Sequence, residues 1–128
     1  MFSLMAEVFE EERQPLTAGY VDRLLQRPGF WAIAAFVDGA IVGGITAHTL
    51  PLTNAETSEI FVYDIAVRPD QQRKGIGRRL IGALREEAAA AGVTVLFVLA
   101  DNEDAHALDF YRSLGAAPTP TTMFSFRR

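Results

Sequence analysis

The stretch YDIAVRPDQQRKGIGRRL, from Tyr63 to Leu80, passes from a strand-like segment through a polar loop into a segment with helical spacing. It places the acid Asp64 in an otherwise apolar strand and gathers cationic side chains around Gly75 and Gly77. The first turn of a helix offers unpaired N–H groups and a positive dipole end, and glycines let an anion approach the backbone. This construction suits a phosphate or pyrophosphate. The Gly-x-Gly alone fits equally well a tight turn before a helix with solvated basic residues.

The rest of the chain alternates between helical and strand patterns. Asp38-Gly39 separates two apolar runs and is a strong hairpin signal. Apolar spacing predicts helices over 2–13, from the cap Thr17 to 27–29, over 75–91 and over 103–113. Strands are expected over 30–37, 40–50, 58–67, 93–100 and 121–126, with 93–100 buried on both faces because it is continuously apolar. The order predicts an α/β sandwich with a mixed sheet, in a single domain spanning residues 1–128.

Composition narrows the class of protein. The chain has 128 residues, no cysteine and a net charge of −4, which excludes disulfides and a cysteine nucleophile and argues against a nucleic-acid partner. Without a long apolar run or a basic leader, a cytoplasmic protein with no membrane span is expected. His48 and His106 are the only histidines and lie far apart, so no metal site is expected. Trp31 is expected in the core.

Two motifs in order resemble the GNAT superfamily of N-acetyltransferases. Its acetyl-CoA signature is Gln/Arg-x-x-Gly-x-Gly/Ala, and Gln72, Gly75 and Gly77 match it. The signature follows a strand that ends in an apolar-x-Val step, which Ile65-Ala66-Val67 matches. Its later Ala-x-x-Phe-Tyr-x-x-x-Gly helix is matched by Ala107, Phe110, Tyr111 and Gly115. Within the superfamily, the Tyr63-Asp64 pair and Asp104, where most relatives have asparagine, resemble the type I aminoglycoside 3-N-acetyltransferases.

The resemblance implies a GNAT fold, with a central mixed twisted sheet flanked by helices and a first strand that is missing or lies upstream. It implies acetyl-CoA as cosubstrate, with the pyrophosphate on the amides from Arg73 to Arg78 and the pantetheine arm pairing with the strand that ends at Val67. The implied cofactor-binding residues are Ile65, Ala66, Val67, Gln72, Arg73, Lys74, Gly75, Ile76, Gly77, Arg78, Asp104 and Tyr111. Of Arg78 and Arg79, one is expected to be merely solvated.

Two residues carry the implied catalysis. Tyr111 would protonate the departing thiolate, or else only pack its ring on a core helix. Asp64 would orient the substrate ammonium and accept its proton directly or through water; alternatively, it pairs structurally with an arginine. Strand alternation places Tyr63 and Ile65 on one face, and Asp64 and Ala66 on the other. The expected substrate-binding residues are Tyr63, Asp64, Glu59, Asp101 and Glu103, with Glu56 and Asp104 nearby.

The expected function is therefore transfer of an acetyl group to an amine of a polycationic small molecule, with the 3-amino group of an aminoglycoside favoured. A carboxylate cluster suits such a substrate because it attracts several ammonium groups. The alternatives are another amine, such as a polyamine or a peptide N-terminus, and a non-catalytic acyl-CoA-binding module. A homodimer is among the expected assemblies.

Overall fold

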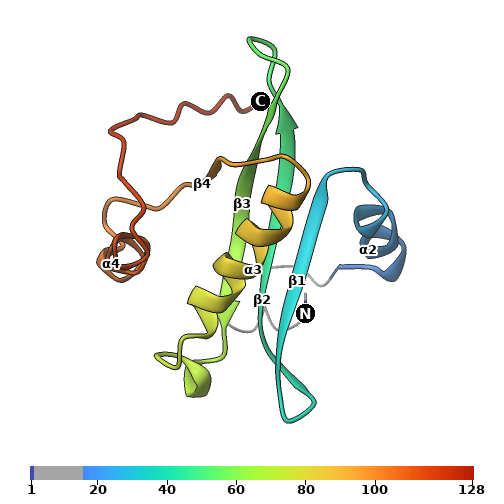
Figure 1. Cartoon of the computed structure of the whole chain (residues 1–128), viewed down its shortest axis with the longest axis vertical. Helices are drawn as coiled ribbons and strands as arrows, with labels where there is room; N and C mark the ends of the chain where they lie inside the picture. Colours follow the sequence, from blue (N-terminus) through green and yellow to red (C-terminus); the bar gives the residue numbers. More distant parts are fainter. Residues whose placement is uncertain (2–15) are drawn as a thin grey trace.

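A four-stranded mixed sheet forms the centre of the molecule in a computed structural model that describes residue 1 and residues 16–128 (Figure 1). The strands are β1 (Phe30–Val37), β2 (Ala40–Pro51), β3 (Ser58–Val67) and β4 (Leu96–Val98). The helices are α2 (Ala18–Leu25), the 3-10 turn η1 (Pro69–Gln71), α3 (Ile76–Ala90) and α4 (Ala105–Ser113). Neighbouring strands follow the order β1-β2-β3-β4, antiparallel except for the parallel pair β3–β4. The predicted mixed-sheet α/β fold is confirmed.

Local signals explain several element boundaries. Thr17 caps α2 by accepting a hydrogen bond from the Tyr20 backbone N–H at 3.2 Å, as its position predicts. Asp38 and Gly39, with φ of 50° and 80°, form the turn of the β1–β2 hairpin, and this prediction too is confirmed. The helix predicted over 2–13 and the question of a preceding strand fall outside the described residues. No helix in the described part of the chain combines the length and apolarity needed to span a membrane.

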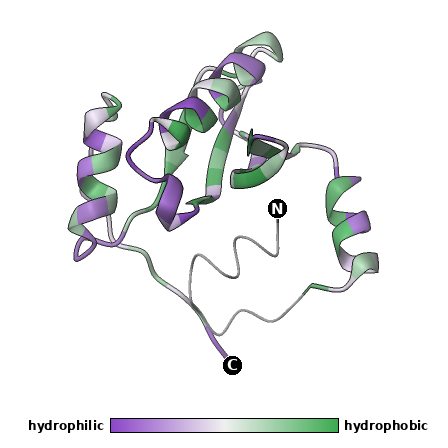
Figure 2. Cartoon of the chain, turned by 90° about the horizontal axis from the view of Figure 1, so that it is seen from below, coloured by the Kyte–Doolittle hydropathy of each residue, from purple (hydrophilic) through white to green (hydrophobic). Residues whose placement is uncertain are grey.

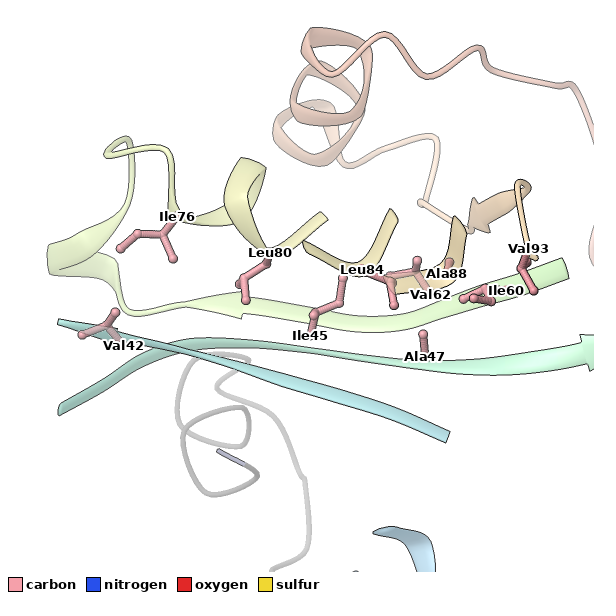
Figure 3. Packing of buried hydrophobic residues seen from close by; sticks show 10 residues of the cluster. All are labelled: Val42, Ile45, Ala47, Ile60, Val62, Ile76, Leu80, Leu84, Ala88 and Val93. Atoms are coloured by element: carbon pink, nitrogen blue, oxygen red, sulfur yellow. The ribbon is translucent and has the colours of Figure 1, made fainter. Parts of the chain in front are cut away.

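The core lies between α3 and one face of the sheet (Figure 3). Four residues of α3 recur at intervals of four and form its buried stripe: Ile76, Leu80, Leu84 and Ala88. Leu84 is fully buried together with Ile45 of β2 and Ile60 of β3. This packing fixes α3 across β2 and β3 and thereby sets where the first turn of α3 lies relative to the end of β3.

One predicted strand is shorter than expected and another is absent. The run 93–100 forms a strand only over Leu96–Val98, and the prediction that it is buried on both faces is wrong, because β4 lies at the edge of the described sheet and exposes one row of side chains. Leu96 and Val98 pack against the core under α3, whereas the alternate side chains are exposed. Residues 121–126 form no strand; the segment is extended and pairs with nothing described (Figure 1).

A β-bulge in β3 changes which side chains share a face. Thr46 of β2 pairs with Asp64 and Ala47 pairs with Val62, so Tyr63 is the extra residue. The Tyr63 ring contacts Phe61 and His48, while Ile65 packs on the core under α3. The prediction that Tyr63 and Ile65 share a face is therefore wrong, because the bulge interrupts the alternation on which it depended.

Candidate active site

A cavity of about 730 Å³ opens where β3 and β4 separate. The two strands pair over only three residues, Ile60 to Val62 with Leu96 to Val98. Beyond that point, no described strand pairs with the outer edge of β3 from Tyr63 to Val67. The first turn of α3 and one side of α4 complete the walls. Its size is that of a small-molecule site, and the free strand edge offers backbone groups to an extended ligand.

The loop between β3 and α3 is held in one shape by its own hydrogen bonds. The Gln72 side-chain amide donates to the Val67 carbonyl oxygen at 3.0 Å, closing the loop back onto the strand end. Arg73 has a φ of 64°, and Gly75, the N-cap of α3, has a φ of 81°. Arg73, Gly75, Ile76, Gly77 and Arg78 all line the cavity. The loop therefore presents the start of α3, with its positive dipole end, to the cavity.

The two glycines of the motif have different surroundings. A Cβ added to Gly75 would meet no heavy atom of the described protein within 4 Å, so its vicinity is open to a ligand. A Cβ added to Gly77 would lie 3.0 Å from Cζ of Phe110 in α4. The first glycine thus fits close approach of an anion to the backbone, as predicted, whereas the second makes room for a ring of α4.

Two basic side chains of the predicted cofactor set contact protein groups. Arg78 donates from its guanidinium to the Ser113 carbonyl oxygen at 3.1 Å, joining the start of α3 to the end of α4. Lys74 does not line the cavity, and its ammonium donates to the Gln71 side-chain oxygen at 3.3 Å. Arg73 also lines the cavity. Unlike Arg78, it makes no hydrogen bond to α4 among the described residues.

α4 brings Tyr111 to the cavity. The Asp104 carboxylate caps the helix by accepting from the Ala107 N–H at 3.0 Å, and both residues line the cavity. Burial, and secondarily the nearby Asp104 carboxylate, raise the pKa of the Tyr111 phenol above its ordinary value. The phenol therefore stays protonated at neutral pH and can act as a proton donor.

Carboxylates also line the cavity. They belong to Asp64, Asp101, Asp104 and Asp109, and the exposed ring of Tyr63 lies among the lining residues. The Asp101 carboxylate also accepts from the Glu103 N–H at 2.9 Å, which fixes the turn before α4. The predicted substrate-binding residues Glu59 and Glu103 do not line the cavity, nor does Glu56. Glu59 pairs with Leu50 at the beginning of β3, away from the strand end that borders the cavity.

Sequence reasoning missed much of the wall that α4 supplies. His106, Asp109, Phe110 and Leu114 line the cavity beside Ala107 and Tyr111. The last three lie three, four and eight residues after His106, so a helical projection places these positions on one face. His106 is exposed and also borders the cavity. Among the described residues, no group of three or more His, Asp or Glu side chains is arranged to hold a metal ion.

The geometry defines a small-molecule site lined by a helix start, a backbone edge and several carboxylates. The sequence model of the acetyltransferase (GNAT) family matches residues 1–116, and the chain belongs to this family. Membership confirms the resemblance carried by the two motifs and supports acetyl-CoA as the cosubstrate.

Three similar proteins place the chain within that family. The structure of aminoglycoside acetyltransferase meta-AAC0020, from an uncultured soil metagenomic sample and in complex with sisomicin, matches with a TM-score of 0.93 and 32% identity, covering 99% of this chain and 85% of that one. Aminoglycoside acetyltransferase HMB0005, also from an uncultured soil metagenomic sample, matches with a TM-score of 0.89 and 35% identity over 98% and 86%.

The third is the [ribosomal protein bS18]-alanine N-acetyltransferase of Escherichia coli (strain K12), 38% identical over 64 residues. That match spans 50% of this chain and 43% of the relative, less than half of the curated protein's length.

Proposed function

We propose that this protein transfers the acetyl group of acetyl-CoA to an amine of a polycationic small molecule. The preferred acceptor in this proposal is the 3-amino group of an aminoglycoside. The observation that carries the proposal is the mixture of charges that line the cavity. The start of α3 and Arg73 line the same cavity as Asp64, Asp101 and Asp109. An anionic cosubstrate and a cationic acceptor would therefore both find groups of opposite charge there and meet beside β3.

In this arrangement, the pyrophosphate binds at the first turn of α3 and the pantetheine amides pair with the free edge of β3. A backbone N–H of that edge polarises the thioester carbonyl and stabilises the oxyanion that forms on it. This placement uses the stretch from Tyr63 to Val67, which no described strand covers on that side.

The transfer proceeds by direct attack, because the chain has no cysteine to form a thioester of its own. Asp64 orients the substrate ammonium and accepts its proton, directly or through water, so that the neutral amine attacks the carbonyl carbon. The C–N bond forms, the C–S bond breaks, and Tyr111 donates its proton to the departing thiolate. The second proton that the attacking nitrogen loses restores the Tyr111 phenol through water, so the products are the neutral amide and the free thiol. The phenol lines the cavity and keeps its proton until the thiolate forms, because burial and the Asp104 carboxylate raise its pKa.

A peptide N-terminus is the second candidate acceptor. The name of the matched alanine N-acetyltransferase gives a ribosomal protein as its acceptor, and that protein is 38% identical to this chain over 64 residues. The two acceptors differ in how many cavity carboxylates they can use, because an N-terminal peptide brings one ammonium whereas an aminoglycoside brings several.

Acetyl-CoA-dependent thiol release separates these acceptors. The panel contains gentamicin, sisomicin, spermidine, a peptide with N-terminal alanine and a neutral amino sugar derivative. We expect the largest kcat/KM with the aminoglycosides, and mass spectrometry with NMR of the product identifies the acetylated nitrogen. Preference for the peptide or for a neutral amine would overturn the substrate assignment, and acetyl-CoA binding without turnover of any amine would indicate a binding module.

A further inference from the structure

The C-terminal end of α4 is held by a side chain from the first turn of α3. The last four carbonyls of a helix have no partner within it. The chain that follows α4 supplies backbone N–H groups to the carbonyls of Tyr111 and Arg112. The carbonyl of Ser113, the last residue of the helix, instead accepts from the Arg78 guanidinium at 3.1 Å. Arg78 therefore completes the end of α4 from a different helix.

The position of Arg78 within its own helix is electrostatically unfavourable. Arg78 is the third residue of α3, where the helix dipole presents its positive end. The carbonyl end of α4 carries the opposite partial charge, so a cation beside Ser113 is favoured. An anion bound at the first turn of α3 would favour the same cation. The guanidinium therefore fits between two negative groups, one in the protein and one in a ligand.

The placement of α4 depends strongly on the first turn of α3. Every residue of α4 is at least partly exposed, and Figures 1 and 2 show the helix at the side of the sheet. Besides the bond to Ser113, the same turn contributes Gly77, where an added Cβ would lie 3.0 Å from the Phe110 ring. Phe110 and Ser113 stand on either side of Tyr111 in the sequence. The position of the phenol thus depends on the turn at which the pyrophosphate is proposed to bind.

We propose that Arg78 is a positioning residue that couples occupancy of the pyrophosphate site to the placement of Tyr111. This inference rests on the proposed binding of acetyl-CoA at α3 and on the proposed acid role of Tyr111. Arg78 lines the cavity, and its guanidinium has several N–H donors in a planar fork, of which the Ser113 carbonyl uses one. Another donor of the fork contacts a phosphate oxygen while that bond is kept. The bound pyrophosphate then fixes the guanidinium, and the guanidinium fixes α4.

Hydrogen exchange of the α4 amides tests this coupling without any acceptor. Saturating acetyl-CoA should slow exchange over α4 in the wild type, whereas S-acetylpantetheine, which lacks the pyrophosphate, should not. Arg78→Ala should lose this protection at saturating acetyl-CoA. Arg79→Ala is the matched control, because it removes the same charge from the same turn at an exposed residue that does not line the cavity, and it should keep the protection. Protection that is absent from the wild type, retained in Arg78→Ala or lost in both variants would overturn the proposal.

Steady-state kinetics separates positioning from simple charge attraction. With both substrates saturating, Arg78→Ala should lower kcat about tenfold, because a displaced acid loses its alignment with the thiolate. Arg78→Lys should restore the KM for acetyl-CoA but not kcat, since an ammonium lacks the planar fork that bridges two acceptors. In a Tyr111→Phe background, Arg78→Ala should lower kcat no further.

Two kinetic outcomes would contradict the proposal. Full recovery of kcat in Arg78→Lys would mean that only charge matters, and equal losses of kcat from Arg78→Ala in both backgrounds would mean that it acts independently of Tyr111. An unchanged kcat in Tyr111→Phe alone would instead overturn the acid role in the proposed function. The exchange measurement would then still support or refute the link between Arg78 and α4.

Discussion

A Cβ added to Gly77 in α3 would lie 3.0 Å from Cζ of Phe110 in α4. The glycine of the loop motif and the aromatic residue of the later motif are therefore complementary in shape. Phe110 stands beside Tyr111 in α4, and their ring centroids are 5.2 Å apart. The contact sets how far α4, and with it the phenol of Tyr111, stands from the first turn of α3.

Gly77→Ala should therefore reduce stability and turnover together. The added methyl group has to displace the Phe110 ring, and overpacking of this kind costs about 1–3 kcal/mol. Gly82→Ala is the matched control, because it lies in the same helix with nothing within 4 Å of its Cβ position and should stabilise α3 slightly. Adding Phe110→Leu to Gly77→Ala should restore part of the melting temperature. Equal melting temperatures for wild type and Gly77→Ala would show that α4 is not held by this contact.

Gly75→Ala should weaken acetyl-CoA binding by a different route. Its φ of 81° strains any side chain by about 1–2 kcal/mol, and the methyl group would occupy the open space beside the start of α3. Gly92→Ala has the same φ to within 1° and equally open surroundings, but lies at the far end of α3, so it controls for strain. The measurement is the rise in melting temperature with acetyl-CoA. A comparable loss of that rise in both variants would place the anion elsewhere.

Tyr111→Phe should lower kcat roughly ten- to a thousandfold, within or somewhat below the usual range of general acid–base catalysis, while acetyl-CoA affinity changes little. Pre-steady-state kinetics with sisomicin as acceptor would show whether the chemical step has slowed. An unchanged chemical step would mean that the ring only packs between α4 and the cavity.

The pH dependence follows from the raised pKa of Tyr111. The phenol donates its proton only below its pKa, so activity should fall on the alkaline side as the tyrosinate forms. Asp104→Asn removes the carboxylate contribution, so the pKa of Tyr111 and the alkaline limb should both move to lower pH. Asparagine keeps the ability to cap α4. Tyrosinate absorbance, with Tyr111→Phe as the reference, follows the titration directly; an alkaline limb that stays in place would assign it to another group.

Asp64→Asn should retain acetyl-CoA binding and lose most transfer to aminoglycosides. The amide neither attracts the ammonium nor accepts its proton, so both KM and kcat suffer. Added salt should raise KM for the wild-type enzyme, since screening weakens the attraction between the cationic substrate and the carboxylates of the cavity. Asp22→Asn removes a carboxylate from α2, outside the cavity, and should change neither constant. Transfer at the parental rate by Asp64→Asn would remove the residue from the mechanism.

Local chemistry explains what the sequence could predict. The Asp38-Gly39 turn and the Thr17 cap depend on near neighbours in the chain, and the apolar stripe of α3 depends on one period. The loop motif was likewise visible because a helix start with glycines needs no distant partner. These features account for the pairing of β1 with β2, the buried face of α3 and the loop that borders the cavity.

Long-range relationships account for what was missed. The bulge at Tyr63 appears only when β3 is paired with β2, and the exposure of β4 appears only when the strand is known to be at an edge. Arg78 has the sequence context of a phosphate ligand, yet it reaches the Ser113 carbonyl 35 residues later. Charge and spacing identify a candidate side chain, but the fold decides what it contacts.

The carboxylates that line the cavity also affect product release in the proposed reaction. Acetylation converts an ammonium into a neutral amide, so the charge attraction between that nitrogen and Asp64 disappears as the product forms. The carboxylates of Asp101 and Asp109 would still attract the remaining ammonium groups. Loss of the positive charge on the acetylated nitrogen would thus weaken binding of the product at the site of transfer. This favours forward turnover and weak product inhibition, and it requires no conformational change.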